Sequence, residues 1–274
     1  SFERAIAADP RHGAAYIGLG ELAMGHASPS PSSRASALRW LRGAVALQPQ
    51  SSTAWLLLGA AQAEAGDAFD DDGGGGLSRS GSSHAHEAIA SLRTAASLDP
   101  LSAHAYWQLG DAHAALGERR RAVRHLGTAV RLRPDHVEAY SSLARVLSYE
   151  ATTERQASLA ALAFRAALRL APTHLETWHN LGEYLHARGD PARASRAFAK
   201  ATQVAPQSGA SYLALGESLQ RLCRVDEANK HYRVAAGLLP RSARAKVHAL
   251  LPAVGRGAPA TAAIVVGSGG GTEG

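Results

Sequence analysis

The stretch Pro172–Pro206, PTHLETWHNLGEYLHARGDPARASRAFAKATQVAP, contains the pattern that decides the fold. Trp178 is followed three residues later by Leu181, and side chains at this spacing lie on one face of a helix. Gly182 and Ala194 are small, so they allow two helix backbones to approach closely. The proline that closes the stretch cannot continue a helix. The stretch therefore predicts two antiparallel helices that pack on each other.

The same pattern recurs along the whole chain. A proline closes each unit, and three of the intervals between these prolines are 34 residues: Pro10, Pro49, Pro100, Pro134, Pro172, Pro206 and Pro240. An aromatic residue opens the first helix of each unit: Tyr16, Trp55, Tyr106, Tyr140, Trp178 and Tyr212. A large apolar residue stands eight positions before each proline: Phe2, Leu41, Leu92, Leu126, Phe164, Phe198 and Tyr232. Six full units can be counted in this way.

Small side chains dominate the predicted core. Hydrophobic residues make up 46% of the chain but aromatic residues only 5%. Alanine stands five residues before every one of the prolines, and a Gly or Ala follows the Leu of each first helix. A single pair of helices cannot bury its apolar face alone, so stacking of successive pairs must bury it. The composition and the repeat together predict an all-α protein.

The order aromatic, Leu-Gly, Ala, apolar, Ala, Pro resembles the consensus of the tetratricopeptide-repeat (TPR) family over residues 1 to about 250. The resemblance implies a TPR-type α-solenoid, a right-handed superhelix of antiparallel helix pairs with about fourteen helices and no sheet. In this family the first helix of each pair (helix A) lines a concave groove, and the second (helix B) forms the convex face. Partners usually lie in the concave groove as extended or helical segments.

We expect a solenoid over residues 1–251 and a flexible tail over 252–274. The solenoid is expected to consist of a partial repeat (1–12), six repeats (13–242) and a capping helix (243–251). Because residues 1–9 form a helix B without its helix A, we expect further repeats upstream or a fragment.

Three insertions interrupt the repeats between helix A and helix B. They lie near residues 25–35, 67–85 and 149–156 and are rich in Gly, Ser and other polar residues. Segments of this composition bury little apolar surface, so we expect them to be disordered or loop-like. The Asp70–Gly76 run lacks the alternating ligands and closing Glu of an EF-hand loop, so it does not predict a calcium site.

The family's register places candidate partner-binding positions beside the core aromatic residue of each helix A. These candidates are Ile17, Glu21, Leu56, Leu57, Trp107, Asp111, Arg145, His179, Asn180, Glu183 and Glu217. Four carboxylates in this set, Glu21, Asp111, Glu183 and Glu217, share one register position. They form either an acidic stripe in the groove or a row of ordinary solvated side chains. Trp107 is either an anchor for a partner or a packing residue against the next helix A.

Several classes of function lack support in the sequence. The net charge of +6 makes nucleic-acid binding a function to consider. The residues that would carry it are arginines of the convex face: Arg119, Arg120, Arg121, Arg124, Arg131 and Arg133. These arginines lack interleaved stacking aromatics, so we do not expect it. The single cysteine, Cys223, suits a reducing compartment such as the cytoplasm. No apolar run is long enough to cross a membrane. We expect no catalytic residue, metal site, cofactor or small-molecule substrate.

The sequence therefore predicts a non-catalytic protein–protein interaction scaffold or adaptor, a subunit of a larger complex. Its partner is expected to be another protein, contacted through a peptide or helix with apolar and basic residues. The apolar candidates lie in the N-terminal half of the groove and most of the carboxylates in the C-terminal half. The alternative is the substrate-recruiting TPR region of a larger enzyme, for example a glycosyltransferase, whose catalytic domain lies outside this chain.

Overall fold

The computed structural model describes residues 2–25, 30–67, 79–149 and 153–250. Within these residues the chain forms fourteen α-helices and no strand, which confirms the predicted all-α class. The helices are α1 (Phe2–Ala8), α2 (Gly13–Met24), α3 (Pro31–Leu47), α4 (Ser52–Asp67), α5 (Arg79–Leu98), α6 (Ala103–Ala115), α7 (Arg119–Leu132), α8 (Val137–Ser148), α9 (Glu154–Leu170), α10 (Leu175–Ala187), α11 (Pro191–Val204), α12 (Gly209–Arg221), α13 (Val225–Leu238) and α14 (Arg241–Leu250).

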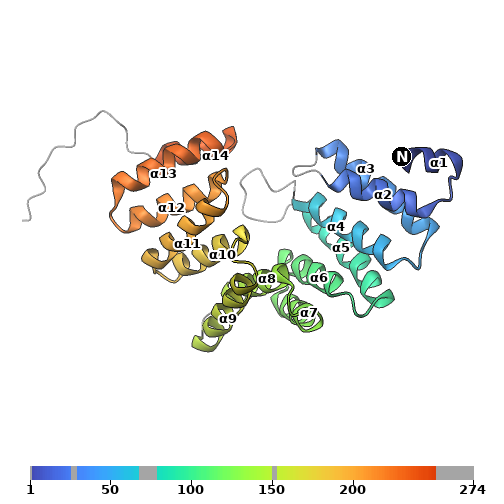
Figure 1. Cartoon of the computed structure of the whole chain (residues 1–274), viewed down its shortest axis with the longest axis horizontal. Helices are drawn as coiled ribbons and strands as arrows, with labels where there is room; N and C mark the ends of the chain where they lie inside the picture. Colours follow the sequence, from blue (N-terminus) through green and yellow to red (C-terminus); the bar gives the residue numbers. More distant parts are fainter. Residues whose placement is uncertain (1, 26–29, 68–78, 150–152, 251–274) are drawn as a thin grey trace, which may run out of the picture.

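The helices are arranged as antiparallel pairs stacked into an arc (Figure 1). The A helices are α2, α4, α6, α8, α10 and α12, and each packs against the B helix that follows it. Successive A helices also contact one another, from α2 to α4 and onward to α10 and α12. The B helices α7 and α9 lie on the outer side of the arc, so the A helices form its inner, concave side (Figure 1).

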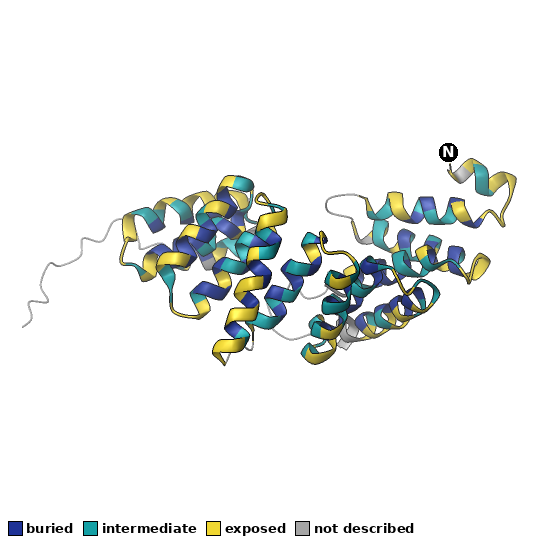
Figure 2. Ribbon diagram, turned by 60° about the horizontal axis from the view of Figure 1, so that its bottom comes forward, coloured by how far each residue is buried: buried dark blue, intermediate teal, exposed yellow. Residues whose placement is uncertain are grey.

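The core follows the repeat that the sequence predicts. The large apolar residue of each complete helix B is buried: Leu41, Leu92, Leu126, Phe164, Phe198 and Tyr232. A fully buried alanine lies one turn before this residue and another lies one turn after it. In α11, for example, Ala194 and Ala201 flank Phe198. Figure 2 shows the result as a buried stripe along the packed faces of the helices, with exposed residues on the outside.

Glycine occupies the contact between the two helices in five of the six pairs, and Ala144 takes its place in α8. A Cβ atom added at Gly182 in α10 would lie 2.5 Å from the ring of Phe198 in α11. Gly216 meets Tyr232 at the same distance in the next pair. No side chain fits in this space without moving the partner helix, because real Cβ contacts are essentially never so short.

The turn after each proline starts the next A helix. The residue two positions after the proline caps the helix by accepting a hydrogen bond from a backbone N–H: Ser51, Ser102, His136, His174 and Ser208. The indole Nε1–H of Trp55 donates to the carbonyl of Pro49 at 2.8 Å, and Trp178 does the same to Pro172. These tryptophans thus hold their A helix against the preceding turn.

All three predicted insertions are partly helical. Helix α3 begins at Pro31, because the Ser30 hydroxyl accepts a hydrogen bond from the N–H of Ser33 and proline suits the first helical position. Helix α5 begins at Arg79 and buries Ala85. Helix α9 begins at Glu154, after a capping box between Thr153 and Gln156. The prediction of disorder was therefore wrong for residues 31–35, 79–85 and 154–156, which extend their B helices toward the N-terminus.

Other expectations fall outside the described residues. Residues 26–29, 68–78 and 150–152 of the insertions belong there, as do residue 251 of the expected capping helix and the expected tail, 252–274. The last helix, α14, begins at Arg241, two residues before the expected capping helix, and packs against α13 with Val247 fully buried.

Candidate binding groove

The predicted groove residues come from all six A helices. Asn180 is buried, Glu21 and Glu183 are exposed, and the other eight are half-buried. Ile17 and Leu57 pack against the buried cluster around Leu41, and Leu56 packs against the cluster around Leu92. The apolar half of the predicted groove is therefore already in contact with the core, which reduces the apolar surface left for a partner.

Trp107 bridges two A helices. Its Nε1–H donates to the hydroxyl of Ser142 on α8 at 3.2 Å. Its ring lies 4.9 Å from the His104 ring and 5.3 Å from the His136 ring, measured between centroids. The structure thus favours packing against the next helix A over the anchor interpretation, although part of the indole stays accessible.

Asp111 continues the same bridge. It accepts hydrogen bonds from the Ser142 hydroxyl at 3.0 Å and from the Arg145 guanidinium at 2.9 Å. Burial raises the pKa of Asp111 to about 6, and the Arg145 charge and the Ser142 hydrogen bond oppose that rise without cancelling it. The acidic stripe is therefore interrupted in the middle of the groove, because Arg145 occupies the corresponding position in the next repeat and pairs with Asp111.

A cleft of about 440 Å³ opens on the groove side between α8, α10 and α12. Four of the predicted residues line it: Arg145, Asn180, Glu183 and Glu217. Hydrogen bonding from His179, 3.4 Å away, lowers the pKa of Glu183, so this carboxyl is ionised at neutral pH. The cleft therefore brings together two carboxylates from neighbouring repeats, whereas the other seven predicted residues do not line it.

Seven residues that line this cleft were not predicted from the sequence, among them Tyr149, Tyr184 and His186. Tyr149 follows α8 and is 64% exposed, with the Arg119 guanidinium 5.7 Å from its ring centroid. Tyr184 forms part of the wall, and His186 lies 3.1 Å from the Ser218 hydroxyl. Burial and the nearby Arg221 lower the pKa of His186, so it is mainly neutral at pH 7. An aromatic residue at the end of a helix A, next to an insertion, was the available signal for Tyr149.

Among the residues that the structure describes, no group of three His, Cys, Asp or Glu side chains could hold a metal ion. No helix there has the length and apolar character that a membrane crossing requires. The cysteine, Cys223, is a free and exposed thiol.

Two stretches of the chain match family models described as tetratricopeptide repeat, residues 81–147 and residues 179–243. The chain belongs to the tetratricopeptide-repeat family. The matched stretches include most of the helices α5 to α8 and α10 to α13, and with them both the Trp107–Asp111 bridge and most of the cleft. A TPR array is a protein-interaction scaffold rather than a catalytic fold.

One TPR relative is tetratricopeptide repeat protein 7B from Homo sapiens, 32% identical over 124 residues. That match covers 45% of this chain but only 14% of the human protein.

Solved structures support the fold alone, because their sequence identities are low. The Cut9–Hcn1 hetero-tetramer of the APC/C has a TM-score of 0.70 at 17% identity, over 91% of this chain and 44% of the other. PilF from Pseudomonas aeruginosa has a TM-score of 0.61 at 19% identity, over 86% and 96% of the two chains. A thermophilic TPR protein of Thermus thermophilus has a TM-score of 0.55 at 18% identity, over 70% and 98%.

Proposed function

We propose that this TPR chain is a non-catalytic scaffold or adaptor subunit that binds a segment of a partner protein on its concave face. The cleft between α8, α10 and α12 receives a basic side chain of that segment, with apolar side chains on either side. The observation that carries this proposal is the meeting of Glu183 and Glu217 at one cleft.

The charge distribution supports a basic side chain at this point. Arg145, the nearby cation, already pairs with Asp111 at 2.9 Å. A Lys or Arg side chain of the partner would meet two carboxylates, which come from adjacent A helices. The cation and both carboxylates are then partly shielded from water. Pairs of this kind add specificity and speed association. We also propose a cytoplasmic location, which a fluorescent fusion of the full-length gene product tests.

A binding experiment tests the concave cleft. The probe is a fluorescein-labelled peptide that carries Leu and Lys residues, compared with the same peptide in which Glu replaces Lys. Glu183→Lys combined with Glu217→Lys should weaken binding by about tenfold or more and flatten its salt dependence, because like charges then face each other. Fluorescence polarisation at two salt concentrations measures both effects.

The matched control makes the same change of charge outside the cleft. Asp135→Lys combined with Asp226→Lys alters two exposed carboxylates, in the turn before α8 and in the first turn of α13. Circular dichroism must first show equal helicity for all variants. Equal binding by the wild type and the cleft variant would exclude this cleft as the site.

A further inference from the structure

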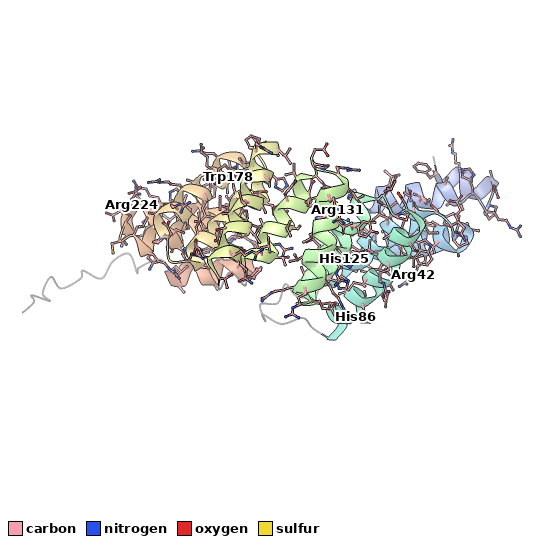
Figure 3. The ribbon with its side chains drawn as sticks, turned by 90° about the horizontal axis from the view of Figure 1, so that it is seen from below. Arg42, His86, His125, Arg131, Trp178 and Arg224 are labelled. Carbon is pink, nitrogen blue, oxygen red and sulfur yellow. The ribbon has the colours of Figure 1, made fainter. Side chains whose placement is uncertain are left out.

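A second and larger cleft lies on the side of α10 away from the groove. It has a volume of about 710 Å³ and lies between α9 and the α10–α11 hairpin. A further hollow of about 540 Å³ continues it along α10 and α11, because both share Trp178, Leu181, Leu185 and Arg193 in their walls. We call this combined hollow the α9–α11 cleft. Figure 3 views the molecule from the convex side and labels Trp178 there.

The α9–α11 cleft is open because α9 packs far less closely on α10 than the other B helices pack on the A helix that follows them. The Tyr184 hydroxyl lies 3.4 Å from the carbonyl of Ala157, and its ring centroid lies 5.8 Å from that of Phe164. Arg188 adds a 3.9 Å ion pair to Glu154. Ala161 and Arg165, one and two turns further along α9, are exposed to solvent. The apolar floor is therefore left open between two convex helices.

Basic residues surround this apolar floor. Six cationic side chains line the α9–α11 cleft, and the only acidic residue among the lining residues is Glu154: the six are Arg165, Arg169, Arg188, Arg193, Arg196 and Lys200. The guanidinium of Arg193 forms an ion pair with the carboxylate of Asp190 at 3.8 Å. Within the described part of the chain, Arg165, Arg169 and Arg196 have no ion-pair partner. The walls thus carry an uncompensated positive charge directly above an apolar surface.

We propose that the α9–α11 cleft binds an acidic, apolar segment of a partner protein, such as an amphipathic helix with Asp or Glu on one side and Leu or Phe on the other. The apolar side chains of that segment lie on the half-buried Leu168 and Leu181, and its carboxylates pair with the surrounding arginines. Arginine binds carboxylates through two parallel hydrogen bonds, which suits this arrangement. The site is independent of the concave groove, where the cleft carries Glu183 and Glu217 and selects the opposite charge.

A protein segment fits the α9–α11 cleft better than a nucleic acid does. Single-stranded nucleic acids rely on aromatic rings for base stacking. The only aromatic side chains that line the cleft are Phe164, Trp178 and Tyr184, and both Phe164 and Tyr184 are buried. The indole N–H of Trp178 already donates a hydrogen bond to the carbonyl of Pro172, and the ring packs against the core. The remaining floor is aliphatic, which complements apolar side chains and not sugars or bases.

The test uses a fluorescein-labelled peptide of about 18 residues, five helical turns, with Glu and Leu at helical spacing. Two comparison peptides replace Leu by Ser or Glu by Lys, and a single-stranded oligo-dT of equal charge is the fourth probe. Fluorescence polarisation should show that the Glu/Leu peptide binds the full chain, more weakly as salt rises. The other three probes should each bind at least about tenfold more weakly.

Two variants test whether the peptide binds in the α9–α11 cleft. Arg165→Glu combined with Arg169→Glu reverses two exposed charges, and Ala161→Trp fills the cleft without changing charge; each should weaken binding about tenfold or more. Arg120→Glu combined with Arg131→Glu, on the exposed surface of α7, is the matched control and should leave binding unchanged. All the altered residues are exposed, and circular dichroism checks that each variant folds.

Several results would overturn the proposal. These are equal binding by the wild type and both cleft variants, equal binding of the Ser-substituted peptide, and tighter binding of oligo-dT. Sedimentation showing a self-association that Ala161→Trp abolishes would make a second copy of this chain the occupant instead. None of these results bears on the concave cleft, which the Glu183→Lys and Glu217→Lys variant tests separately.

Discussion

At the scale of single residues, Cys223 occupies a backbone conformation that favours glycine. Its φ is 60°, and Gly117 and Gly189, in the corresponding A-to-B turns of other repeats, have φ of 73° and 75°. A non-glycine residue in this region costs roughly 1–2 kcal/mol, part of which is offset because glycine has more freedom in the unfolded chain.

We therefore expect Cys223→Gly to raise the free energy of unfolding by roughly 0.5–1 kcal/mol. Urea denaturation followed by circular dichroism measures the change. Gly189→Ala is the matched opposite substitution and should lower stability, because alanine must then adopt a left-handed conformation with no compensating contact. A Cys223→Gly variant less stable than the wild type would contradict this account of the turn.

Asp111 gives the molecule a distinctive pH dependence. Its pKa is raised to about 6 from an ordinary 3.8, so between these values the folded chain holds a proton that the unfolded chain has lost. Asp111 therefore adds stability as the pH falls from 7 toward 4. Since the side chain is 31% exposed, we expect an effect on the order of 1 kcal/mol.

Asp111→Asn isolates that contribution. Burial lowers the pKa values of His104, His125, His136, His186 and His231, so these residues destabilise the fold as the pH falls below 6.5. That trend is common to the wild type and the variant, and subtraction removes it. The difference in unfolding free energy should grow in favour of the wild type between pH 7 and pH 4. Parallel pH profiles would show that Asp111 titrates normally.

At the scale of helices, the contact between A and B depends on glycine at some positions but not at others. Gly182→Ala should destabilise the chain by roughly 1–3 kcal/mol, because its methyl group would overlap Phe198. Gly127, in α7, has no atom within 4 Å of an added Cβ atom, so Gly127→Ala should stabilise by about 0.5–1 kcal/mol. Thermal melts of the two variants measure both signs, and equal melting temperatures would contradict the helix register.

The helices and their packed faces were predictable from the sequence, because small and large residues recur at the same positions in every repeat. The sequence did not predict where α3 and α5 begin, since those starts depend on a local cap at Ser30 and on extra turns such as the one that buries Ala85. The pairing of Asp111 with Arg145 was visible as opposite charges at one register position in consecutive repeats. The α9–α11 cleft was not predictable, because it depends on the separation between helices rather than on the residues of one helix.

At the scale of the whole molecule, the buried residues are unevenly connected. One continuous cluster of fifteen runs from α8 to α14, from Ala144 to Val247. Within the described part of the N-terminal half, the buried residues divide into clusters of six, six and three. Because the stability of a repeat array is set by contacts between neighbours, the two halves should differ in their resistance to opening.

Hydrogen exchange tests this difference. We expect amides of α10 to α13 to exchange most slowly and those of α2 and α3 to exchange faster by an order of magnitude or more, since local opening is governed by local burial. Mass spectrometry of peptic fragments gives the rates, with Gly182→Ala as a control that should accelerate exchange chiefly in the C-terminal half. Uniform exchange along the array would show that it opens as a single cooperative unit.

The direct contacts between successive A helices have a mechanical consequence. Neighbouring A helices touch along the inner edge of the arc, whereas the outer B helices are separated enough to leave the α9–α11 cleft open. At this junction we expect bending to open or close the α9–α11 cleft, while the inner edge, where α8 and α10 touch, changes less. A partner segment that lies along the groove would then meet these two repeats at a nearly constant spacing.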